Sequence, residues 1–350
     1  MQLAFMDAEF NIIRYFKYIN LQWLRRYYEP GEFSVQLPDS EYEENAVYIF
    51  TNDRPELGLV QKKHYADGYD GEVIQISGYF YEYKLNDKIT YPRFNSSGNI
   101  EILARRIVET YREDIPILQL GPENSPLLGT SITKESTGDG LASVLFEMLK
   151  TQELSLRCVY DYQANTMSFI VWQGKDRTQN QSENSFVTFS EGFRNMQNEE
   201  IVVDTSNFKN YAVVIGNGKY EDGKQIEVIV DLRASSDIYA QKIYVDKTGM
   251  TFDSSKQTRA QYEEQLRQAG IEELAKYNNI TNVMFDTIDR GLTYMVDYDL
   301  GDKCDAILDS VSQSYTVRLT EIHELFKESK HTVTLILGEK VPTVYSKARR

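Results

Sequence analysis

The hydrophobic pattern predicts a strand-rich start, a mixed middle and a strand-rich end. In residues 31–38, apolar and polar residues alternate with period two, which is typical of a half-buried strand. Glu29-Pro30-Gly31, just before it, is a turn signal. Further strands are expected at 2–6, 11–18, 19–28, 46–51, 56–63 and 71–83. Residues 1–97 therefore predict a small antiparallel barrel or sandwich.

The middle of the chain, residues 98–204, predicts an α+β domain. Its first helix has Ile100, Leu103, Ala104, Ile107, Val108 and Tyr111 on one face. Asn99 or Ser97 is expected to cap that helix. A second helix is expected at 141–149 with Thr137 or Asp139 as its cap, and strands follow at 155–162 and 167–173. The polar loop 174–184 contains no apolar anchor.

Residues 205–340 predict a second β-rich domain with a helical insertion near 254–280, before a tail at 341–350. Strands 211–217 and 225–232 are expected to form a hairpin, and a helix is expected at 259–277. The other strands are expected at 239–245, 292–298, 302–308, 314–325 and 331–337. The predicted fold class is thus α+β and β-rich.

The composition excludes several functions. The formal net charge is −15, and the only basic block is Lys347–Arg350. Because nucleic-acid binders need cations to neutralise phosphates, specific nucleic-acid binding is not expected. No apolar run is long enough for membrane insertion, and the N-terminus does not resemble a signal peptide. Cys158 and Cys304 are expected to be reduced thiols in a protein that folds in a cytoplasm.

The three histidines, His64, His323 and His331, do not have the spacing of a zinc site. His331 could approach His323 across a hairpin. We interpret both as polar residues near the end of that hairpin.

Four aspartates, at 297, 299, 302 and 305, crowd one segment. A calcium site or a glycosidase acid/base pair would use such residues, but the EF-hand spacing fails because Leu300 stands in a ligand position. We expect instead a tight turn in which Gly301 has a positive φ. The Gly/Asp-rich segment 67–72 is read in the same way, and Gly216-Asn217-Gly218 is read as part of a hairpin rather than a phosphate loop.

Tyrosine and phenylalanine are abundant, at 25 and 16 residues. The stretches 25–28 and 79–83 could be sugar-stacking platforms. Alternating aromatic residues more often place one set of rings in the core and the other at an interface.

Several segments together resemble a known family. They are Trp23–Tyr28, Pro30–Pro38, Ile74–Tyr79, Leu85 with Asn86 and Ile89, Asn207–Phe208, Ala212–Gly216 and Tyr298–Asp302. In order and spacing they resemble siphovirus tail proteins of the hub type, the Gp37-like family of ReqiPepy-type phages. These are similar to baseplate hub proteins and to the N-terminal part of tail-associated lysins.

The resemblance implies two tube-like antiparallel β-barrel domains around the α+β middle domain. It implies a homotrimer that closes or extends the tail tube at the virion tail tip, made and folded in the bacterial host cytoplasm. The implied partners are a distal tail protein, a tape-measure protein and tail fibre or lysin components. No enzyme activity and no cofactor are expected, because the chain stops near Arg350 without a lytic module.

The structural signature residues that the resemblance implies are Gly31, Phe33, Gly78, Gly216, Tyr298, Leu300, Gly301 and Asp302. No catalytic, cofactor-binding or metal-binding residue is expected. If the ring surrounds a DNA path, acidic lumen residues would repel phosphates. The alternatives left open are a receptor- or carbohydrate-binding tail protein and, further, a cell-wall hydrolase.

Overall fold

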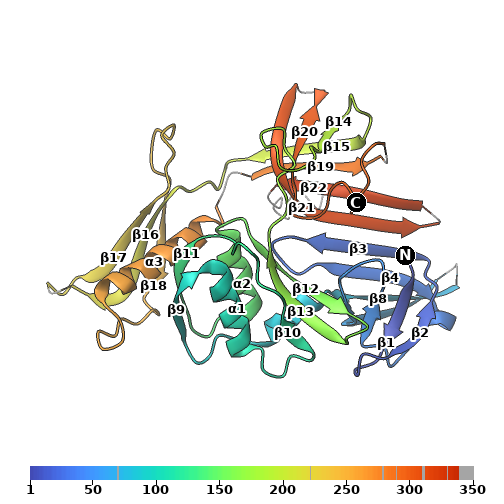
Figure 1. The fold of residues 1–350 in the computed structure, drawn as a ribbon, viewed down its shortest axis with the longest axis horizontal. Helices are drawn as coiled ribbons and strands as arrows, with labels where there is room; N and C mark the ends of the chain where they lie inside the picture. Colours follow the sequence, from blue (N-terminus) through green and yellow to red (C-terminus); the bar gives the residue numbers. More distant parts are fainter. Residues whose placement is uncertain are drawn as a thin grey trace.

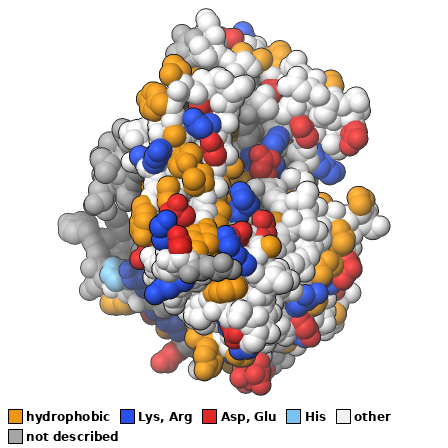
Figure 2. All heavy atoms as spheres, turned by 90° about the vertical axis from the view of Figure 1, so that its left-hand side faces the viewer, with side chains coloured by type: hydrophobic (Ala, Val, Ile, Leu, Met, Phe, Trp, Pro, Cys, Tyr) orange, Lys and Arg blue, Asp and Glu red, His pale blue; other side chains and the backbone are white. Residues whose placement is uncertain are grey.

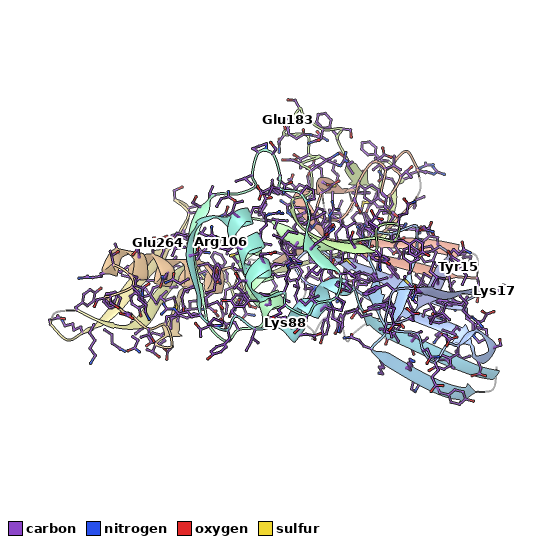
Figure 3. The ribbon with its side chains drawn as sticks, turned by 60° about the horizontal axis from the view of Figure 1, so that its bottom comes forward. Tyr15, Lys17, Lys88, Arg106, Glu183 and Glu264 are labelled. Atoms are coloured by element: carbon purple, nitrogen blue, oxygen red, sulfur yellow. The ribbon has the colours of Figure 1, made fainter. Side chains whose placement is uncertain are left out.

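The computed structural model describes residues 1–68, 71–220, 222–277, 280–288, 290–309, 312–328 and 330–338. The expected tail at 341–350 and the centre of the expected turn at 67–72 lie outside these residues. The molecule is elongated (Figure 1). Figure 3 places Tyr15 and Lys17 near one end and Glu264 toward the other, with Arg106 between them.

A ten-stranded sheet, built by both β-rich ends of the chain, is the largest element (Figure 1). Its main path runs through β15 (Met196–Asp204), β19 (Ile280–Thr287), β22 (Lys330–Gly338), β21 (Gln313–Lys327), β3 (Asn20–Arg26), β4 (Glu32–Pro38), β8 (Gly71–Tyr79) and β7 (Lys62–Gly68). All neighbouring pairs on this path are antiparallel. β20 (Lys303–Leu308) pairs with β21, and β14 (Thr188–Ser190) pairs with β20.

The pairing of β3 with β21 joins the two ends of the chain. Leu24 lies opposite His323, and Trp23 lies opposite Glu324. One sheet therefore continues from the N-terminal to the C-terminal β-rich region without a break.

A second, four-stranded sheet covers the core face of the N-terminal part. It consists of β2 (Ile12–Phe16), β1 (Leu3–Met6), β5 (Tyr48–Phe50) and β6 (Gly58–Leu59), in that order. Phe5 packs from this sheet into the same buried cluster as Trp23 and Phe33 of the large sheet. The period-two pattern found in the sequence therefore reflects two facing sheets.

The middle region packs its helices on short sheets. It consists of β9 (Phe94–Asn99), α1 (Ile100–Tyr111), β10 (Leu118–Leu120), β11 (Ser131–Ser136), α2 (Leu141–Lys150), β12 (Ser155–Asp161) and β13 (Thr166–Trp172). Asn99 caps α1 as predicted, because its side chain accepts hydrogen bonds from the backbone N–H groups of Glu101 and Ile102. The predicted side-chain cap of α2 is wrong, since Gly140 occupies the N-cap position and makes no such bond.

An inserted unit with its own core follows. It contains β16 (Tyr211–Lys219), β17 (Gln225–Asp231), β18 (Lys242–Lys247) and α3 (Arg259–Leu274). The predicted hairpin is the antiparallel pair of β16 and β17. Thr258 and Gln261 form a capping box at the start of α3. Gly270 lets α3 approach the sheet, since a Cβ there would lie 2.7 Å from side-chain atoms of both Val214 and Val230.

The predicted strand-rich α+β class is confirmed. The sheets are open, however, and not the closed barrels that were expected within one chain. The strand predicted at 292–298 is also wrong, because Met295 has a φ of 65° and the segment forms a turn closed by a bridge between Tyr294 and Tyr298. The boundaries at 97 and 204 stay a prediction.

Candidate functional site: a polar junction around residues 298 to 302

The segment Tyr298–Asp302 forms a buried turn between the large sheet and the middle region. Gly301 has a φ of +83°, which confirms the predicted positive φ. A Cβ at this position would lie 2.5 Å from the ring of Tyr27. Tyr298 and Leu300 are buried in the hydrophobic core of the C-terminal β-rich region. The turn thus needs glycine both for its backbone and for its close packing.

Asp302 connects the polar loop 174–184 to this turn through hydrogen bonds and an ion pair. Its carboxylate accepts hydrogen bonds from the backbone N–H of Lys175 at 2.7 Å and from Nε of Arg177 at 2.6 Å. Asp302 and Arg177 are both buried. The loop that lacks an apolar anchor is therefore held by a buried ion pair.

Arg25 connects β3 to the same region. Its guanidinium donates to Glu56 at 2.6 Å, to Asp299 at 2.5 Å and to the hydroxyl of Tyr294 at 2.9 Å. Burial alone would lower the pKa of Arg25. The carboxylates of Glu56 and Asp299, together with Tyr294, instead raise it well above its usual value, so the guanidinium stays charged.

Glu324 forms a second buried centre on the same face of the sheet as Arg25, and the hydroxyl of Tyr294 contacts both side chains. Its carboxylate accepts hydrogen bonds from the guanidinium of Arg54 and lies 2.9 Å from Nε2 of His331. Burial would raise the pKa of Glu324, but its hydrogen bonds with His331 and Arg54 outweigh burial and lower it. The carboxylate is therefore ionised and paired.

Arg318 and Glu153 complete the junction. Arg318 donates to the carbonyl oxygen of Gly301 at 2.5 Å and to the carboxylate of Glu153 at 2.8 Å. Glu153 also pairs with Lys303 at 2.6 Å, and its backbone carbonyl accepts the hydroxyl hydrogen of Tyr27 at 3.0 Å. These contacts link the N-terminal, middle and C-terminal parts of the chain. We name the network around residues 298–302 the polar junction.

This geometry suits attachment better than catalysis. The four clustered aspartates turn to different partners: Asp297 to the N–H of Thr293, Asp299 to Arg25, Asp302 to Arg177 and Asp305 to the N–H of Gln179. Among the described residues, no group of three or more His, Cys, Asp and Glu side chains could hold a metal ion.

The histidines do not come together either. His323 lies opposite Thr334 and contacts Glu321, whereas His331 lies opposite Phe326 and contacts Glu324. His64 lies on β7. Cys158 and Cys304 are both buried and free, as expected.

The remaining signature residues lie in two other places, where they allow close packing. A Cβ on Gly78 would lie 1.8 Å from the carbonyl oxygen of Leu59, and one on Gly31 would lie 2.6 Å from the ring of Phe80. Phe33 is buried beside them. Gly216 lies in the inserted unit, where a Cβ would lie 2.2 Å from the hydroxyl oxygen of Tyr262. The structure therefore separates these signature residues from the junction.

Of the six aromatic residues in the stretches 25–28 and 79–83, three are buried and three are partly exposed. Tyr27, Phe80 and Tyr81 are buried, while Tyr79 and Tyr83 stack on each other at 4.3 Å. Those rings are therefore engaged within the protein rather than presented together as a platform.

Sequence reasoning missed a polar groove of about 800 Å³ on the outer face of the large sheet. It crosses β22, β21, β3, β4, β8 and β7. Its lining combines charged residues, apolar residues such as Leu24 and Leu325, and seven side chains with amide or hydroxyl groups: Gln22, Ser34, Gln61, Gln75, Ser77, Thr332 and Thr334. Alternation along each strand could have identified them, but only once the pairing of β3 with β21 was known.

Figure 2 shows the side of the molecule that carries the inserted unit. Positive and negative side chains are mixed on this side. Lys and Arg side chains alternate with Asp and Glu, and apolar side chains lie between them. This face therefore does not form a field of one sign. Within the described residues, no helix is both long and apolar enough to cross a membrane.

The sequence matches the family described as Siphovirus ReqiPepy6 Gp37-like protein over residues 5–339. The chain belongs to this family. The match covers both β-rich regions, the polar junction and the inserted unit. The family resemblance read from the sequence is thereby confirmed. A search of the curated proteins finds no match.

Three solved structures share the fold of this Gp37-like chain over nearly its whole length. A tail protein from Neisseria meningitidis MC58 is 13% identical with a TM-score of 0.60, covering 97% of this chain and 96% of that chain. The 43 kDa tail protein of prophage MuSo2 from Shewanella oneidensis is 12% identical with a TM-score of 0.58, covering 96% and 98%. Prophage tail protein gp18 from Listeria monocytogenes EGD-e is 11% identical with a TM-score of 0.55, covering 100% and 98%. The family and these neighbours are phage tail proteins rather than enzymes.

Proposed function

We propose that this chain is the structural subunit of a phage tail-tip hub, which closes or extends the tail tube as a homotrimer. The hub would connect the tube to host-recognition parts. Its partners would be the distal tail protein, the tape-measure protein and tail fibre or lysin components. Its place would be the virion tail tip, after folding in the host cytoplasm.

The observation that carries this proposal is the single sheet shared by both ends of the chain. β3 and β21 join the two β-rich regions into one continuous wall with a polar outer face. A sheet that has one buried face and one solvated face suits the wall of a water-filled tube. The polar junction behind it would keep the two halves of the wall in fixed register.

We propose further that the polar groove faces the channel. Its lining contains Glu32, Glu324, Lys62 and His323 among many uncharged groups, and Glu324 is buried and paired with Arg54, so Glu32 and Lys62 are the charges left to balance each other. DNA would then pass because few cations are available to bind phosphates, rather than because an acidic wall repels it. The acidic lumen suggested by the net charge stays a prediction.

Native mass spectrometry of the full chain tests the assembly. The proposal expects a species of three times the 40.6 kDa chain mass, alone or after addition of the distal tail protein. A strictly monomeric chain under both conditions would contradict the hub assignment.

A further inference from the structure

A small cavity lies where the middle region meets the large sheet, beside the polar junction. Its volume is about 20 Å³. Side chains from β3, the turn after it, the segment before β6, α2, β12 and β13 line it (Figure 1). Leu300 of the polar junction also belongs to the lining. The N-terminal, middle and C-terminal parts of the chain therefore all contribute to this one cavity.

Polar atoms that make no hydrogen bond gather in its wall. In the part of the chain that the structure describes, four lining residues each have one such buried atom: Nε of Arg26, Oε2 of Glu56, Nε of Arg157 and Nε1 of Trp172. A buried polar atom without a partner costs free energy, because it has given up its bonds to bulk water. Four such atoms around one cavity therefore indicate a bound polar group.

The other contacts of Arg26 and Glu56 show which of these atoms need that group most. The guanidinium of Arg26 already pairs with Glu32 at 2.7 Å, and its Nε lies 3.5 Å from a carboxylate oxygen of Glu29. Glu56 uses Oε1, which accepts a hydrogen bond from Nε of Arg25 at 2.6 Å. Its second oxygen, Oε2, is left as an acceptor that faces the cavity wall.

Arg157 and Trp172 supply two donors. The guanidinium of Arg157 lies 4.8 Å from the ring centroid of Trp172, so the two side chains stack. Burial lowers the pKa of Arg157, and the nearby positive charge of Arg25 lowers it further. A hydrogen bond accepted from Nε of Arg157 would stabilise the charged form. Nε1 of Trp172 can only donate.

One water molecule matches this set of partners. It can accept the two N–H groups and donate to Oε2 of Glu56, and buried waters typically make about three hydrogen bonds. A cavity of about 10–15 Å³ is enough for one water, whereas most organic ligands need far more. A chloride ion could accept from Arg157 and Trp172, but it would place a negative charge against Oε2 of Glu56.

We propose that this cavity binds one ordered water molecule, which accepts hydrogen bonds from Arg157 and Trp172 and donates one to Glu56. The water would join the stacked pair of the middle region to the Arg25–Glu56 pair beside the large sheet. The site lies within one chain and does not rest on the proposed hub function.

A crystal structure of the full chain, at a resolution that shows ordered water, tests the site directly. We expect one density peak about 2.7–3.2 Å from Nε of Arg157, Nε1 of Trp172 and Oε2 of Glu56. A direct contact between Arg157 and Glu56, or a cavity without such a peak, would overturn the proposal. An anomalous peak in the cavity after a bromide soak would also overturn it, because the bound species would then be an anion.

Nuclear magnetic resonance tests the same water in solution. The indole N–H of Trp172 should show a cross-peak to water, and W172F identifies this signal because the chain has only two tryptophans. R157M removes one donor and should abolish the cross-peak. R106M, the same substitution at an exposed arginine, is the matched control and should keep it.

A cross-peak that survives in R157M would contradict the proposed set of partners. The crystal measurement needs no substitution, so it decides the question even if R157M does not fold. Neither result depends on whether the chain assembles, and a monomeric protein with this water would leave the inference intact while contradicting the hub assignment.

Discussion

Asp302 and Arg177 form a buried ion pair, with 2.6 Å between a carboxylate oxygen and Nε, although 125 residues separate them. The pair attaches a loop of the middle region to the turn that precedes β20. Neither residue belongs to an apolar pattern. The contact therefore shows that buried charges, as well as hydrophobic packing, hold the parts of this chain together.

Substitution of Asp302 by alanine should leave the buried Arg177 without its partner. Breaking a buried pair in this way costs about 3–5 kcal/mol. We expect the free energy of unfolding in urea, followed by tryptophan fluorescence, to fall by that amount. D87A is the control, because Asp87 pairs with Lys84 at the surface and should lose at most about 1 kcal/mol. Equal losses in the two variants would contradict the role of the junction.

Gly78 should not tolerate a side chain. The Cβ of G78A would meet the backbone carbonyl of Leu59, which cannot move without disturbing β6, so we expect a loss of about 3 kcal/mol. A Cβ at Gly249 would meet nothing within 4 Å, and the φ of this glycine lies outside the left-handed region, so G249A should be neutral or slightly stabilising. Thermal unfolding of both variants checks this, and a neutral G78A would argue against the packing of β8 on β6.

Glu82 should make stability depend on pH. Burial raises its pKa from 4.5 to about 7. Between these values the unfolded chain ionises this carboxyl while the folded chain keeps it protonated, so its contribution to stability falls as pH rises from about 4.5 to 7. The loss approaches about 3 kcal/mol above pH 7.

The variant E82Q removes this titration while keeping an acceptor for the N–H of Cys158, which donates to Glu82 at 2.7 Å. E82Q should be more stable than the wild type at pH 8, and the difference should disappear near pH 4. E113Q, the same substitution at an exposed glutamate, is the matched control. A constant difference between E82Q and wild type across this range would show that Glu82 does not titrate as described.

Tyr262 should stabilise the inserted unit locally. Its hydroxyl accepts the N–H of Asn217 at 2.7 Å and donates to the carbonyl of Met250 at 2.7 Å. Y262F leaves those groups without this partner, so amide exchange in β16 should accelerate about tenfold. Amides of β3 should keep their rates, because the inserted unit has its own core. Equal acceleration in both strands would mean that the unit does not open separately.

Local patterns in the sequence predicted local structure well. The apolar spacing from Ile100 and the amide of Asn99 give α1 its face and its cap, since both act within a few residues. The positive φ of Gly301 follows from the crowding of polar turn residues around one glycine. These are short-range effects that a sequence pattern records.

Long-range pairing was not visible in the sequence. The strand β19 was missed, and 292–298 was predicted as a strand because its aromatic residues resemble one. Tyr294 instead turns its hydroxyl toward Arg25, far away in the chain. The pairing of β3 with β21 and the polar groove likewise depend on residues about 300 positions apart, which no periodicity connects.

A cryo-electron microscopy reconstruction of the assembled protein, alone or with the distal tail protein, tests the central claim most directly. We expect three copies around a threefold axis, with Gln22, Ser34 and Ser77 of the polar groove facing the channel. A ring in which this face points outward, or is covered by another subunit, would contradict the account.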